Sequence, residues 1–160
     1  MYKSKDFKEM IIVNSKNKYQ GKVSKILFDI NEKKLIGFKI NFMFSYHKNN
    51  FASTLNIKNI TNKIYVSKLT RIKINEDNFI INSEIYDKDG TLMGNISEVL
   101  VDENNYNIKA FIVTPGILEK FILGKVIVLA SDVYKSGNYI MCKGKSSIKF
   151  FSMIHEETRL

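Results

Sequence analysis

The stretch that decides the fold occurs twice, as Gly-Lys-Val-Ser-Lys-Ile-Leu-Phe-Asp at residues 21–29 and as Gly-Asn-Ile-Ser-Glu-Val-Leu-Val-Asp at residues 94–102. Four positions are identical, and three further positions are apolar in both stretches. The stretches lie 73 residues apart, and the same spacing matches residues 12–14 with 85–87 and Phe38 with Phe111. The chain is therefore predicted to contain two copies of one module in tandem.

Each copy has the pattern of short strands separated by turns. Apolar residues, several of them β-branched or aromatic, fill 23–28, a polar turn follows at 29–34, and a second apolar stretch occupies 35–40. The second copy repeats this order at 94–101, 102–105 and 108–113, and Gly90 marks a tight turn before it. Short strands with frequent turns predict an all-β fold of two small barrels or sandwiches with few short helical turns.

Beyond these strands we expect the copies to differ in one loop. Residues 42–62 are aligned with a shorter counterpart at 115–123, after which 63–66 falls on 125–128. Each copy is expected to close on a short apolar strand, at 79–81 and at 139–141. The predicted boundaries are 1–83 for the first repeat, 84–145 for the second and 146–160 for a C-terminal tail. The apolar run at 148–154 suits either a last strand or a short docking segment.

The repeated motif resembles the PRC-barrel domain. The pattern is Gly-x-[Val/Ile]-x-x-[Ile/Val]-Leu-x-Asp, then a polar turn and an apolar strand; residues 87–94 make the second copy the better match. The first copy has Asn-Ser-Lys-Asn-Lys at 14–18 and lacks the turn glycine. The resemblance implies one compact β-barrel per copy. The PRC-barrel domain is found in the photosynthetic reaction-centre H subunit, in 16S rRNA maturation proteins and as short free-standing bacterial proteins. The resemblance therefore also implies an assembly or adaptor role without catalysis.

The net charge of +9 is divided unevenly between the copies. Residues 1–83 carry 16 basic and 6 acidic side chains, whereas residues 84–160 carry 9 and 10. The first copy could therefore attract an anionic partner, and its candidate anion contacts are Lys22, Lys25, Lys33 and Lys34. An RNA- or ribosome-associated factor is the alternative function on this basis. The competing interpretation is that these lysines form a solvated basic face. Lysine far outnumbers arginine in the chain, and arginine is the residue better suited to bidentate contacts with phosphates and bases.

Residues suited to catalysis do not form a recognisable pattern. His47 and His155 lie in different copies without counterparts, and Cys142 has no histidine near it in sequence. Asp29 and Asp102 each follow a strand and precede a turn, where aspartate bonds the local backbone. No zinc spacing, calcium loop or glycine-rich phosphate loop is present in the sequence. We therefore expect a non-catalytic protein without a cofactor.

The loop after the first copy's second strand is unusually apolar. Phe42, Phe44, Tyr46 and Phe51 are predicted to contribute to a contact with a partner protein or with a second copy of the chain. The alternative is that these aromatic residues fold back over their own barrel. The sequence has no run of 18 apolar residues, no signal-peptide pattern and one cysteine, which favours a cytoplasmic protein without a membrane span.

Overall fold

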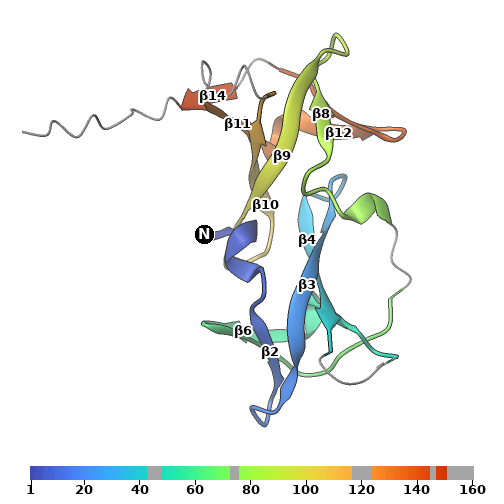
Figure 1. The fold of residues 1–160 in the computed structure, drawn as a ribbon, viewed down its shortest axis with the longest axis vertical. Coiled ribbons are helices and arrows are strands. Elements are labelled where there is room, and N and C mark those ends of the chain that lie inside the picture. Colours follow the sequence, from blue (N-terminus) through green and yellow to red (C-terminus); the bar gives the residue numbers. More distant parts are fainter. Residues whose placement is uncertain (43–47, 73–75, 117–123, 145–146, 151–160) are drawn as a thin grey trace, which may run out of the picture.

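The computed structural model of the chain describes residues 1–42, 48–72, 76–116, 124–144 and 147–150. Each copy builds one sheet, and Figure 1 shows the first copy below the second. The first sheet has six strands in the order β5-β4-β3-β2-β7-β6. Their bounds are β2 Ile11–Asn14, β3 Tyr19–Asp29, β4 Lys34–Asn41, β5 Phe51–Ser53, β6 Ile57–Ile60 and β7 Lys63–Val66.

The second sheet has eight strands in the order β12-β13-β8-β9-β10-β11-β14, with β1 paired to β9 beside this path. Their bounds are β1 Tyr2–Lys3, β8 Glu84–Tyr86, β9 Leu92–Val101, β10 Ile108–Thr114, β11 Lys125–Leu129, β12 Val133–Ser136, β13 Tyr139–Cys142 and β14 Ser147–Phe150. In the part of the chain that the structure describes, four short 3₁₀ helices connect strands: η1 Ser4–Phe7, η2 Thr54–Asn56, η3 Glu76–Asn78 and η4 Ala130–Asp132. The all-β prediction is thus confirmed. Within the described ranges, no helix is long and apolar enough to cross a membrane.

The turn before the repeated strand is built in the same way in both copies. Asn14 Oδ1 accepts hydrogen bonds from the backbone N–H groups of residues 16 and 18, and Asp87 Oδ1 accepts from those of residues 89 and 91. The turn needs a residue with positive φ, which is Gly90 at 80° in the second copy and Asn17 at 57° in the first. Asparagine tolerates this left-handed region, so the first copy keeps the turn without the glycine.

The hairpin turns confirm the structural role predicted for the two aspartates. Asp29 Oδ1 accepts a hydrogen bond from the N–H of Glu32, and Asp102 Oδ1 accepts from the N–H groups of Asn104 and Asn105. These bonds satisfy turn amides that have no partner in the strands. Hydrogen bonds to the backbone and to Lys109 lower the pKa of Asp102, although desolvation opposes them.

The alignment of the later strands was wrong. Both β7 and β13 pair in parallel with the strand that begins the repeat motif, with Ile12 opposite Ile64 and Ile85 opposite Ile140. Residues 63–66 therefore correspond to 139–142, while β11 corresponds to β5 on the edge of the hairpin. Residues 79–81 lie outside the strands, so the expected closing strand there is also wrong. The second sheet extends past the expected boundary at residue 145, because β14 pairs with β11.

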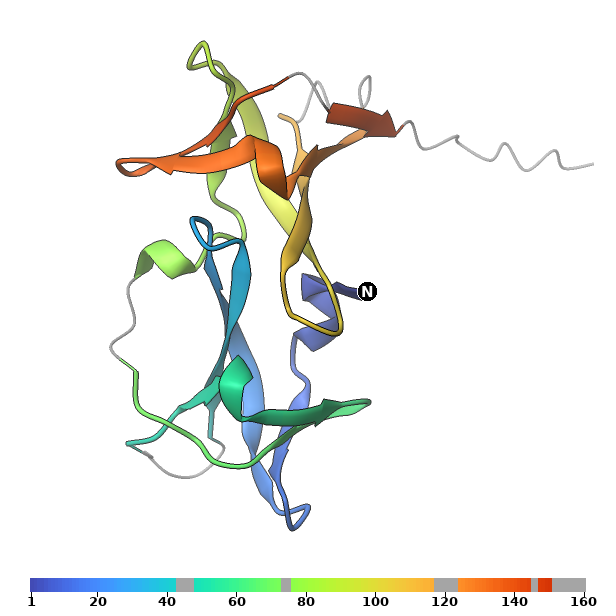
Figure 2. The same ribbon diagram turned by 180° about the vertical axis from the view of Figure 1, so that it is seen from behind.

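The two copies meet where their long hairpins turn. An antiparallel bridge joins Lys34 to Asn107, which are equivalent positions 73 residues apart. On either side of it, the N–H of Leu35 donates to the carbonyl of Tyr106, and the N–H of Ile108 donates to that of Lys33. Each bond is the repeat-related image of the other, so an approximate twofold axis passes through this bridge. Figure 2 shows each hairpin reaching toward the neighbouring copy.

The N-terminal arm of residues 2–7 belongs structurally to the second copy. Tyr2 pairs with Val101 and Lys3 with Leu100, so β1 adds to the second sheet. The buried hydroxyl of Ser4 accepts a hydrogen bond of 3.0 Å from the N–H of Val99. The 73-residue spacing places η3 opposite η1, so η3 leads the second copy although it precedes the expected boundary at residue 84. Its Asn78 side-chain amide donates to the carbonyl of Phe28 in the first copy. Each copy therefore lends its leading segment to the other.

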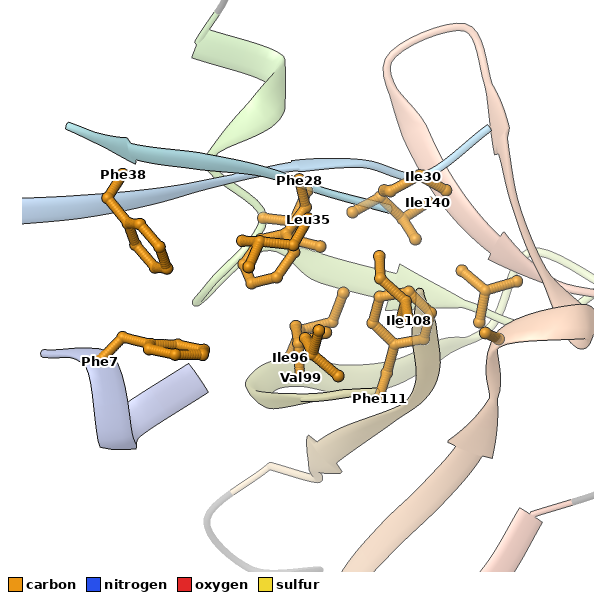
Figure 3. Packing of buried hydrophobic residues seen from close by; sticks show 14 of the residues in the cluster. Phe7, Phe28, Ile30, Leu35, Phe38, Ile96, Val99, Ile108, Phe111 and Ile140 are labelled. Atoms are coloured by element: carbon orange, nitrogen blue, oxygen red, sulfur yellow. The ribbon is translucent and has the colours of Figure 1, made fainter. Parts of the chain in front are cut away.

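Among the described residues, one cluster of buried apolar side chains from both copies fills the space between the sheets. It extends without interruption from Phe7 and Phe38 to Phe111 and Ile140. Figure 3 shows Phe28 and Leu35 of the first copy facing residues of the second copy such as Ile96 and Val99. Phe7 is fully buried, with its ring centroid 4.9 Å from that of Phe38. A module of about 80 residues buries a limited apolar area alone, so this shared core stabilises both copies.

Candidate functional site

Of the four aromatic residues predicted to form a contact, Phe51 is buried and Phe42 is partly exposed. Phe51 begins β5 and is 1% exposed, so it belongs to the core and cannot contribute to a contact surface. Phe42 is half-buried and packs against the core cluster that the two copies share. Phe44 and Tyr46 lie outside the described residues. The predicted contact therefore loses Phe51, because a core side chain of the folded barrel does not reach a partner.

The four candidate anion contacts do not form one site. Lys22 and Lys34 lie at opposite ends of the β3–β4 ladder, since Lys22 pairs with Asn41 and Lys34 with Asp29. At about 3.3 Å per residue, this separates the two backbone positions by roughly 20 Å. The lysines can contact separate phosphates along a polyanion, but they cannot enclose one anion.

Three of these lysines also have partners within the chain. Lys22 Nζ lies 3.9 Å from Glu9 Oε2, and Lys25 Nζ lies 4.4 Å from the centre of the Phe79 ring. Lys33 Nζ donates to the carbonyl of Val133 in the second copy. Desolvation by burial, and secondarily the charge of Lys143, lowers the pKa of Lys33. Lys33 thus helps to join the copies and is the least available of the four for an external anion.

An open pocket of about 350 Å³ lies on the second copy, where η3 and the segment after it meet β8, β12 and β13. Three aromatic and three charged side chains are among those that line it: Phe79, Tyr86, Tyr139, Asp77, Glu84 and Lys135. Figure 1 shows β8 and β12 near the top of the molecule, and β13 lies between them in the sheet and pairs with both. The pocket thus combines aromatic surface with both signs of charge.

Two tyrosines form the aromatic wall of this pocket. The rings of Tyr86 and Tyr139 are 5.6 Å apart in an edge-to-face arrangement, and Tyr139 is 60% exposed. The Tyr86 hydroxyl donates a hydrogen bond of 2.5 Å to Glu84 Oε2. That bond is the main reason why the pKa of Tyr86 is raised. The tyrosine pair is therefore held in place by packing and by a charge-assisted hydrogen bond.

The first copy does not reproduce this wall. Tyr86 corresponds to Val13, because both residues follow the same bulge in the paired strands. Tyr139 corresponds to Lys63, since these residues begin the equivalent strands β13 and β7. The 73-residue spacing of the sequence already placed Tyr86 opposite Val13. An aromatic residue opposite an aliphatic one was the signal that the copies differ at this position. Tyr139 was missed because its strand had been aligned with the wrong partner.

Of the residues weighed for catalysis, the described ones, Asp29, Asp102 and Cys142, do not line this pocket. His47 and His155 lie outside the described residues. The thiol of Cys142 is buried, and desolvation raises its pKa, which makes it less reactive. Among the described residues, no group of three or more His, Cys, Asp or Glu side chains is placed to hold a metal ion.

The chain consists of two β-rich modules with a shared core and has a pocket on its second copy. This architecture is that of a tandem small-barrel protein. The PRC-barrel domain family model matches residues 1–71 and again residues 73–146. The chain therefore belongs to the PRC-barrel domain family, in a two-copy form, and the resemblance seen in the motif is confirmed. No curated protein matches the chain. PRC-barrel domains are generally non-enzymatic, which is consistent with a binding module.

Proposed function

We propose that this chain is a non-catalytic adaptor that binds a partner protein through the pocket of its second copy. The observation that supports this function is the exposed tyrosine wall: Tyr139 is 60% exposed beside Tyr86 at the opening of a 350 Å³ pocket. Tyrosine is enriched in protein interfaces because it offers a large apolar face and a polar tip at low entropic cost.

The absence of the tyrosine pair from the first copy adds to this proposal. Both copies need the same turns and core to fold, so the repeat explains their shared residues. A pair of aromatic residues that appears on one copy, partly exposed, contributes less to that common fold. Phe42, Phe44 and Tyr46 remain a second proposed contact, and the bacterial cytoplasm remains the proposed setting.

The adaptor function is tested by partner capture with a matched pair of variants. Tyr139→Ala removes the exposed ring of the pocket, and Tyr19→Ala removes a 46% exposed tyrosine of the first copy as the control. A partner identified by crosslinking in the native cell is purified, and its affinity for each variant is measured. We expect Tyr139→Ala to weaken binding by at least about tenfold, as for an interface hot spot, and Tyr19→Ala to leave it unchanged. Equal affinities for both variants would contradict the proposal.

The alternative is an RNA- or ribosome-associated factor that uses the basic first copy. Its support is the excess of 16 basic over 6 acidic side chains in residues 1–83. The dispersed lysines favour sequence-independent contacts with a polyanion over a single anion site. A titration with structured RNA at two salt concentrations tests it, with Lys34→Glu as the variant. Binding that weakens steeply with salt and with Lys34→Glu would favour this function, whereas absent or salt-independent binding would rule it out.

A further inference from the structure

The pocket carries one acidic group whose charge is not balanced by a neighbouring cation. Lys135 Nζ lies 2.7 Å from Asp77 Oδ2, and the Lys135 side chain is only 21% exposed, so this pair is already formed. Glu84 accepts its hydrogen bond from the neutral hydroxyl of Tyr86. In the described part of the chain, no ammonium or guanidinium group lies within 4.0 Å of the Glu84 carboxylate. The pocket therefore presents a negative charge beside two tyrosine rings.

The chain's own cations show what the walls of this pocket accept. Lys25 places its ammonium 4.4 Å from the centre of the Phe79 ring, and Lys135 places its ammonium against Asp77. An aromatic face attracts a cation through the quadrupole of the ring, and a carboxylate attracts it through its charge. Tyr86, Tyr139 and Glu84 offer the same combination, and their ring and carboxylate surface opens to solvent.

We infer, on the basis of the proposed function, that the pocket receives an arginine side chain of the partner protein, with its guanidinium at Glu84 and against the tyrosine pair. Arginine fits better than lysine because its planar guanidinium can stack on a ring while it donates two parallel hydrogen bonds to a carboxylate. A carboxylate has about four lone-pair positions, so Glu84 can keep the Tyr86 bond and still accept from the ligand.

Small arginine probes test this assignment without a known partner. Amide chemical shifts of the ¹⁵N-labelled protein are followed during titration with N-acetyl-arginine amide and with its neutral isostere N-acetyl-citrulline amide. We expect saturable shifts at residues 84, 86 and 139–140 with the arginine probe. Affinity should be about fivefold or more weaker for citrulline, because its neutral ureido group cannot form an ion pair with Glu84. Glu84→Gln should reduce the arginine affinity by a similar factor, whereas Tyr19→Ala should not change it.

The outcomes separate this inference from the adaptor function. Equal affinity for arginine and citrulline, or unchanged affinity in a folded Glu84→Gln protein, would overturn the arginine assignment. If the arginine probe fails to bind while Tyr139→Ala still abolishes partner capture, the assignment fails and the adaptor function stands. If Tyr139→Ala leaves partner capture intact, the adaptor function fails. The assignment of a partner arginine to the pocket then fails as well.

Discussion

Replacing Phe7 with alanine tests whether the two copies fold as one unit. Phe7 is fully buried, and its ring lies 4.9 Å from that of Phe38 and 5.2 Å from that of Tyr2. Truncating a buried phenylalanine to alanine costs about 3–5 kcal/mol through lost apolar transfer and the cavity left behind. Domains of this kind have about 5–15 kcal/mol of stability in total, so Phe7→Ala removes a large part of it.

The measurement is urea unfolding followed by far-UV circular dichroism, since the chain has no tryptophan. We expect one transition in the wild-type protein and one transition at lower urea in Phe7→Ala, with an unchanged slope, because the core is continuous. Phe7→Leu keeps most of the apolar volume and should cost about 2 kcal/mol or less. A cost below about 1 kcal/mol for Phe7→Ala, or separate transitions for the two copies, would refute the shared core.

Three further substitutions test the close backbone contact between β9 and β10, the N-terminal arm and the turn at Asp102. Gly94→Ala should destabilise the fold by more than about 2 kcal/mol, because Gly94 has a φ of +137° and an added Cβ would lie 2.3 Å from the backbone oxygen of Thr114. In the control Gly116→Ala, the added Cβ meets no atom within 4 Å, so this variant should be nearly neutral in thermal unfolding. Ser4→Ala leaves the buried N–H of Val99 without its acceptor and should cost about 1–3 kcal/mol in urea unfolding; no measurable loss would argue against the arm contact. Asp102→Asn should be less stable than the wild-type protein near neutral pH. The pKa of Asp102 is lower in the folded state than its ordinary value of 3.8, so the ionised carboxylate stabilises the fold at pH values above 3.8, and this stabilisation disappears as pH falls through the folded-state pKa. The unfolding curves of the two proteins should therefore converge in acid.

Local sequence patterns predicted the parts of the fold that local interactions build. Strand alternation and turn residues identified both copies, and the turn role of Asp29 and Asp102 followed from their position between strand and turn. The same patterns failed for the later strands, where 63–66 had been aligned with 125–128. Both segments read as a lysine followed by apolar residues, and alternation alone does not say which distant strand each one joins.

The sequence by itself determined that the chain repeats one β-rich module and that its charge is concentrated in the first copy. Only the tertiary structure decided that β1 joins the second sheet, that the hairpins pair at Lys34 and Asn107, and that Tyr86 meets Tyr139 at a pocket. The physical reason is the distance along the chain over which each interaction acts. Turns and strand alternation depend on neighbouring residues, whereas these contacts join residues about 50 to 100 positions apart and form only when two complementary surfaces bury their apolar area together.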